Sequence, residues 1–197
     1  MFSSKMTSLL WGIIFLIIGL IGIDMYSSRH KDLSIPVKDC VPTFADGDGP
    51  YYKPNVPYRS KLSPQNHQGE KLVVYGRVLR KDCTTPVKNV TLDIWQADEK
   101  GTYQNETYRG KVKTDNRGFY IFETVKPKGY GEGTGYRPAH IHFKVWDGTR
   151  LIITSEMFFP EVKGTPGFDD AFIMHIESEG QGKERHLKGN HDIILPE

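Results

Sequence analysis

Short runs of alternating polar and apolar residues fill the chain from Leu72 to its end, and they constrain the fold more than any other feature. Alternation with a period of two is typical of half-buried strands, and closely spaced turn residues are typical of sandwiches and barrels. We therefore predict an all-β domain, an antiparallel β-sandwich with no long amphipathic helix. The runs, each bounded by Gly, Pro, Asn or Asp, are LVVYGRVL, VTLDIWQA, KVKT, FYIFETV, HIHFKVW, LIITSEMFF, AFIMHIE and HDIIL.

The charge distribution argues against one large class of function. The 197-residue chain has a formal net charge of +2, from 26 Lys and Arg against 24 Asp and Glu. The excess lies in residues 1–38, so the rest of the chain is balanced. Because nucleic-acid binding needs a basic face or stripe, we expect no nucleic-acid partner.

Residues 9–23 form an uncharged apolar run, LLWGIIFLIIGLIGI, between Lys5 and Asp24. As a helix this run is about 22 Å long, so it crosses a bilayer only together with its flanking residues. That length fits either a secretory signal or a membrane anchor. The following MYSSRHKD offers a poor cleavage site. We therefore favour an N-terminal hydrophobic helix within residues 1–28 that stays attached and holds an extracytoplasmic domain, periplasmic or extracellular, at the membrane.

The chain after this segment is interpreted as a linker, residues 29–45, and a domain, residues 46–197. The stretch up to the first strand is rich in Pro, Asp, Asn and Gly, which predicts an irregular arm. Cys40 and Cys83 can form a disulfide in an oxidising compartment, and chain-entropy estimates give the closed loop about 4 kcal/mol of stabilisation. The alternative is two unpaired core cysteines.

His140 and His142 lie in the segment RPAHIHF. Residues two apart on a strand point to the same face, so the two imidazoles are neighbours. Paired imidazoles offer two ligands of a metal site, although such pairs also occur on solvated strands. Tyr103 and Tyr130 lie upstream at predicted strand-to-loop positions and are candidate partners.

Several stretches resemble the intradiol ring-cleavage dioxygenases, the family of catechol and protocatechuate dioxygenases. The resemblance covers about residues 46–197. Tyr51 and Tyr52 in DGPYY match an element that lines the substrate mouth in the family. The alternative is that the two tyrosines have a packing role. Sandwich modules of the transthyretin (prealbumin) type share the strand rhythm without catalysis, so fold alone carries no function. The other matching stretches are GRVLRKDCTTPVKNVTLDIWQADEKGTY, TDNRGFYIFETVKP, YRPAHIHFKV and HDIIL.

The resemblance implies a non-haem Fe(III) ion held by Tyr103, Tyr130, His140 and His142. It also implies that Tyr130 accepts a substrate proton and that Arg137 stabilises negative charge on the bound ring. Phenolate oxygen suits a hard ferric ion, and coordination lowers the phenol pKa from about 10. The implied reaction opens a catechol with O2 to a cis,cis-muconate-type diacid, and both oxygen atoms enter the product.

Two features depart from the family pattern. The loop between Tyr130 and Arg137 is short, and Tyr136 is close enough to compete as the second tyrosinate, although the P-x-x-Y setting favours Tyr130. Glu156 stands where the family has Gln, and its carboxylate either adds negative charge beside the iron or turns away.

Two other functions are consistent with the sequence. One is a membrane-tethered β-sandwich binding module that has the scaffold without turnover. The other is a metalloenzyme that binds Cu or Zn through His140, His142 and a carboxylate. Neither has a tyrosinate-to-iron colour, which separates both from the dioxygenase. The identity of the catechol and the oligomeric state stay open.

Overall fold

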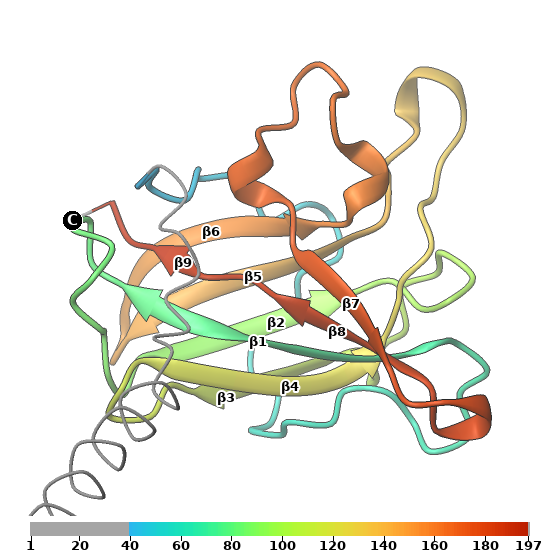
Figure 1. Cartoon of the computed structure of the whole chain (residues 1–197), viewed down its shortest axis with the longest axis horizontal. Helices are drawn as coiled ribbons and strands as arrows, with labels where there is room; N and C mark the ends of the chain where they lie inside the picture. The colour runs from blue at the N-terminus through green and yellow to red at the C-terminus, as the bar shows by residue number, and fades with distance from the viewer. Residues whose placement is uncertain (1–39, 197) are drawn as a thin grey trace, which may run out of the picture. The chain divides into compact units, whose positions relative to one another are not determined.

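The computed structural model describes residues 40–196, which form two β-sheets that pack on one another (Figure 1). One sheet has the strand order β3-β2-β5-β6, and the other has the order β4-β1-β8-β7, with β9 also paired to β1. The strands are β1 (Lys71–Leu79), β2 (Thr91–Gln96), β3 (Arg109–Lys113), β4 (Phe119–Val125), β5 (His140–Asp147), β6 (Arg150–Phe158), β7 (His175–Glu179), β8 (His186–Asn190) and β9 (Ile193–Ile194). Short 3-10 turns are η1 (Gly133–Gly135), η2 (Pro160–Val162), η3 (Asp170–Phe172) and η4 (Gly182–Glu184).

The core lies between the two sheets and is built by strand alternation. Val74 of β1 and Phe122 of β4 face Ile94 of β2 and Phe143 of β5, and all four side chains are completely buried. Apolar burial is the main stabilising contribution to such a core. The predicted all-β sandwich is confirmed.

The sheet order differs from the prediction in one respect. Strand β1 pairs antiparallel with β4 but parallel with β8 and β9, so the sandwich is not purely antiparallel. Parallel neighbours need a long connection, which the intervening strands supply here. The sequence HLKGN of β8 was not predicted as a strand because it contains a single large apolar residue. The first part of AFIMHIE belongs to η3 rather than to a strand.

The irregular arm before β1 is attached to both sheets. Thr43 donates its backbone N–H to Ile194 O at 2.8 Å, and Asp46 donates its own to Thr154 O at 2.8 Å. Further along, Leu62 N–H donates to Glu123 O at 2.8 Å. These bonds draw the arm across the outer face of the four-stranded sheet, where Gly49 passes beside the His142 ring and Asp48 accepts a hydrogen bond from Lys144 of β5.

Cys40 and Cys83 form a disulfide, with their Cα atoms 5.8 Å apart, which confirms the pairing. The predicted hydrophobic N-terminal helix lies outside the described residues. Within residues 40–196, no helix has the length and apolar character needed to span a membrane.

Among the glycines of the described residues, Gly76 in β1 has the least room for a side chain. A Cβ atom there would overlap the carbonyl oxygen of His191, which also accepts a hydrogen bond from the Tyr120 hydroxyl at 2.6 Å. We expect Gly76→Ala to lower the free energy of unfolding by about 2 to 3 kcal/mol, measured by urea denaturation, because the backbone has to shift. Gly135→Ala is the control, since a Cβ at Gly135 meets no atom within 4 Å. Equal stabilities of the two variants would contradict this account.

Candidate metal centre

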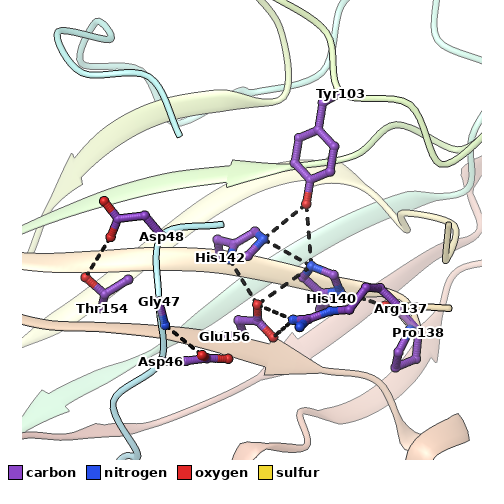
Figure 2. A network of polar contacts seen from close by, with 10 residues as sticks. All are labelled: Asp46, Gly47, Asp48, Tyr103, Arg137, Pro138, His140, His142, Thr154 and Glu156. Carbon is purple, nitrogen blue, oxygen red and sulfur yellow. Dashed lines mark hydrogen bonds and ion pairs between the residues drawn. The ribbon is translucent and has the colours of Figure 1, made fainter. Parts of the chain in front are cut away.

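Two imidazoles from β5 meet on the outer face of the four-stranded sheet (Figure 2). His140 and His142 are 2% and 3% exposed, and their Nε2 atoms lie 3.1 Å apart. Ile141 between them points into the core, as strand alternation requires. The two histidines therefore share one face, as their spacing predicts.

The loop after β2 brings a phenol to the same point. Tyr103 Oη lies 3.1 Å from Nε2 of His142 and 3.4 Å from Nε2 of His140. Asp98 shapes this loop, because its Oδ1 accepts hydrogen bonds from two backbone N–H groups within the loop, each at 2.9 Å. The segment WQADEKGTY thus delivers Tyr103 to the histidine pair.

The neighbours of the two Nδ1 atoms determine which nitrogen of each imidazole carries the lone pair. Nδ1 of His140 lies 2.6 Å from Pro138 O, so it carries the proton and donates it, and Nε2 keeps a lone pair. Nδ1 of His142 lies 3.2 Å from Oε1 of Glu156, close enough for attraction although not aligned as a hydrogen bond. With a proton on each Nδ1, two Nε2 lone pairs converge beside the Tyr103 oxygen. A cation relieves their repulsion, so these residues fit a single metal ion.

Burial keeps these donors neutral. It lowers the pKa of His140 to about 4 and that of His142 to about 2, in the second case reinforced by the charges of His140 and Arg137. Burial also raises the pKa of the Tyr103 phenol. Metals bind neutral imidazole and deprotonated phenol, so a metal here has to displace only the phenol proton. A hard cation of high charge does this most readily.

Tyr130 lies beside the cluster, whereas Tyr136 lies on the exposed loop. The ring centroid of Tyr130 is 5.5 Å from that of Tyr103 and 5.7 Å from that of His140. Tyr136 is 56% exposed. Two backbone hydrogen bonds between Tyr130 and Arg137, of 3.0 Å and 2.8 Å, close the loop between them, and Tyr136 lines a cavity next to this loop.

Arg137 and Glu156 form an ion pair at the edge of the centre. Nη2 of Arg137 donates to Oε1 and Oε2 of Glu156 at 2.6 Å and 2.7 Å. The carboxylate is 3% exposed and the Arg137 side chain is 44% exposed, so the arginine is partly open to a ligand. Burial, partly offset by Arg137, raises the pKa of Glu156 to about 7. The carboxylate that replaces the family's Gln therefore faces Arg137 and lies next to His142.

Aromatic rings of the arm and of β2 support the donors. Tyr51 stacks on Tyr103 with centroids 4.1 Å apart and planes within 10°. Trp95 stacks on His142 at 4.8 Å and 3°, and Tyr52 packs against Trp95 at 4.9 Å. Tyr51 therefore contacts a metal-site residue directly, whereas Tyr52 contacts the site through Trp95.

Sequence reasoning missed Trp95 and Lys144. Lys144 Nζ donates to Asp48 Oδ2 at 2.7 Å and lies 4.0 Å above the Tyr52 ring, although the residue is only 4% exposed. The pattern H-x-H-x-K contains the signal, because period-two alternation places Lys144 on the face of the two histidines. This lysine anchors the arm above the site.

A cavity of 270 Å³ opens beside the ion pair. Arg137, Pro138 and Glu156 line it, and Phe44 and Phe168 contribute to its apolar walls. Glu156 connects the cavity to the histidines, because its carboxylate lines the cavity and lies 3.2 Å from Nδ1 of His142.

Comparisons with known proteins agree with this site. A sequence model of a protein family described as "Dioxygenase" matches residues 47–180. The β chain of protocatechuate 3,4-dioxygenase from Burkholderia cepacia is 36% identical over 110 residues, which cover 47% of this chain and 46% of that protein. Catechol 1,2-dioxygenase from Acinetobacter baylyi is 28% identical over 165 residues, 68% of this chain and 52% of that protein.

The chain belongs to the intradiol ring-cleavage dioxygenase family. It spans about half the length of the curated family members described above. Among solved structures of the family, the dioxygenase domain of a dioxygenase and carbohydrate-binding protein fusion from Streptomyces sp. SirexAA-E superposes with a TM-score of 0.67 at 32% identity. That match covers 79% of this chain and 98% of the domain.

The neutral buried imidazoles predict an acid-sensitive metal-free protein. Unfolded imidazoles take up protons below their ordinary pKa of 6.5, whereas His140 and His142 resist protonation down to about 4 and about 2, so acid favours the unfolded state. The raised pKa of Glu156, about 7 instead of 4.5, makes acid favour the folded state and so opposes the effect of the histidines. Because one carboxyl group opposes two imidazoles, the histidines determine the direction. We expect stability to fall by on the order of 1 kcal/mol from pH 6.5 to pH 5.

Urea denaturation of chelator-treated protein at both pH values measures this fall. The double variant His140→Gln, His142→Gln should lose the acid sensitivity, because only the opposing Glu156 remains. A wild-type stability that is constant over this range would contradict the prediction.

Proposed function

We propose that the chain is a non-haem Fe(III)-dependent intradiol dioxygenase that opens a catechol ring with O2 to a cis,cis-muconate-type diacid. The observation that carries this proposal is the convergence of two imidazole nitrogens and one phenol oxygen within 3.4 Å of one another, in a chain of this family. A ferric ion is the hard cation that such donors suit. The names of the catechol and protocatechuate dioxygenase relatives support the same class of reaction.

We assign the metal to Tyr103, Tyr130, His140 and His142. Three of these side chains already meet, and Tyr130 lies within ring contact of two of them. Its position beside the cluster supports Tyr130, rather than the exposed Tyr136, as the second tyrosinate.

The Cu or Zn alternative needs a carboxylate ligand, and Glu156 is the one near the histidines. Its Oε1 lies 3.2 Å from the outer Nδ1 of His142 and 3.9 Å from Nε2 of His140. Both its oxygens are also engaged by Arg137. This orientation favours Glu156 as a partner of Arg137 over Glu156 as a ligand, which supports the tyrosinate assignment.

When bound, Fe(III) supplies a Lewis acid that orients both catechol oxygens and makes the ring reactive toward O2. Tyr130 Oη accepts one phenolic proton of the catechol as the substrate enters. Arg137 lines the cavity and is partly exposed, which supports a role in stabilising negative charge that develops on the ring. Tyr51, stacked on Tyr103, shields the ligand phenol from water.

The tyrosine assignment predicts distinct outcomes for three substitutions. Tyr103→Phe and Tyr130→Phe should each remove or strongly shift the visible tyrosinate-to-iron absorption and lower ring cleavage by at least about a hundredfold, because each loses a metal ligand or a proton acceptor. Tyr136→Phe should keep colour, iron content and most activity. Metal analysis, visible spectra and oxygen uptake with catechol measure these effects.

Iron-free, colourless but folded wild-type protein from iron-rich medium would overturn the proposal. If Tyr136→Phe bleaches the protein while Tyr130→Phe does not, the function stands and the second tyrosinate is Tyr136.

We further propose that residues 1–28 anchor the domain to a membrane on its extracytoplasmic side. The apolar run of residues 9–23 and the disulfide between Cys40 and Cys83 support this location, because disulfides persist in oxidising compartments. Full-length protein should remain in the membrane fraction after a salt wash. N-terminal sequencing that finds mature protein starting near Arg29 would contradict the anchor.

A further inference from the structure

The cavity beside the metal-binding face has apolar aromatic walls. Four phenylalanines line it and contact one another in two pairs. Phe44 and Phe172 lie edge to face with centroids 6.0 Å apart, and Phe158 and Phe168 do so at 4.8 Å. Such walls accept an aromatic ring and discriminate little between its substituents, so selectivity has to come from the polar groups.

Three charged side chains line the cavity, as far as the described residues show: Asp46, Arg137 and Glu156. Arg137 donates to both carboxylate oxygens of Glu156 at 2.6 Å and 2.7 Å, so a substituent near this arginine also lies near the carboxylate paired with it. The Asp46 carboxylate is held at the cavity by the backbone, because its Oδ1 accepts the Gly47 N–H at 2.6 Å (Figure 2). The Asp46 N–H in turn donates to Thr154 O at 2.8 Å. The three groups together carry one net negative charge.

We propose that this cavity selects catechols whose ring substituent is uncharged or cationic and rejects catechols that carry a carboxylate, with Asp46 and Glu156 as the specificity-determining residues. The inference rests on the proposed function and names its substrate class. A carboxylate substituent meets Asp46 at close range, while the one cation of the cavity is already paired. An ammonium substituent meets a carboxylate and the faces of phenylalanine rings, both of which attract it.

Three probes of nearly equal size test the proposal: 3,4-dihydroxybenzylamine, 3,4-dihydroxybenzyl alcohol and 3,4-dihydroxybenzoate. Binding of each to the iron-loaded full chain is measured anaerobically by calorimetry at pH 8, and ring cleavage is measured separately by oxygen uptake. We expect the amine and the alcohol to bind at least about tenfold more tightly than the benzoate. The reason is that one partly screened repulsion, between the benzoate carboxylate and Asp46, opposes binding. The order of kcat/KM should be the same.

The carboxylate of the benzoate also changes the electronic properties of its ring. Variants are therefore needed to show that Asp46 and Glu156 cause the discrimination against it. Asp46→Asn should reduce the Kd ratio of benzoate to alcohol by about fivefold or more. Glu156→Gln should reduce it further, since it removes a negative charge and frees Arg137. The control is Asp147→Asn, which removes an equal charge at a side chain that is 64% exposed on the β5 to β6 turn, and it should leave the ratio unchanged.

Benzoate binding equal to or tighter than alcohol binding, or a ratio that Asp46→Asn leaves unaltered, would overturn the charge selection while the proposed function stands. The expected binding order without ring cleavage supports the charge selection and overturns the proposed function. Binding of none of the three probes overturns both.

Discussion

The two-residue alternation of strand β5 connects the core to the metal-binding face. Ile141, Phe143 and Val145 fill the space between the sheets, so the residues between them are forced onto the outer face. A slip of one residue in the pairing of β5 would turn the imidazoles into the apolar core and the core side chains onto the outer face. The hydrophobic effect thus determines the register, and the register determines where His140 and His142 point.

Pairing with the two neighbouring strands determines which side chains lie beside the histidines. His142 is paired with Trp95 of β2 on one side and with Glu156 of β6 on the other. One imidazole therefore has a stacking partner and a charged neighbour without any loop being involved. Only the phenols of Tyr103 and Tyr130 come from loops, and each loop is closed by backbone hydrogen bonds at its base or within it.

Local patterns in the sequence were sufficient for the strands, the shared face of the histidines and the family. They were insufficient for features of the structure that depend on contacts between residues distant in the chain. Glu156 is an example, because its environment depends on Arg137, 19 residues away across β5 and β6. Strand β8 was missed for a related reason: HLKGN has little apolar pattern of its own, and its position beside β1 stabilises it. The P-x-x-Y setting favoured Tyr130 over Tyr136, but its place beside Tyr103 and His140 depends on the folded loop and could not be derived from the sequence.

The arm that covers the site is fastened to the far end of the chain. Thr43 exchanges two hydrogen bonds with Ile194, through its backbone N–H at 2.8 Å and through its hydroxyl oxygen at 2.9 Å. During synthesis Thr43 is made about 150 positions before Ile194, so these two bonds form only after β9 has been made, although Cys40 can already be joined to Cys83. The cover over the donors on β5 is therefore secured in stages: the disulfide of Cys40 and the bond to Thr154 can form first, and the bonds to Ile194 come last.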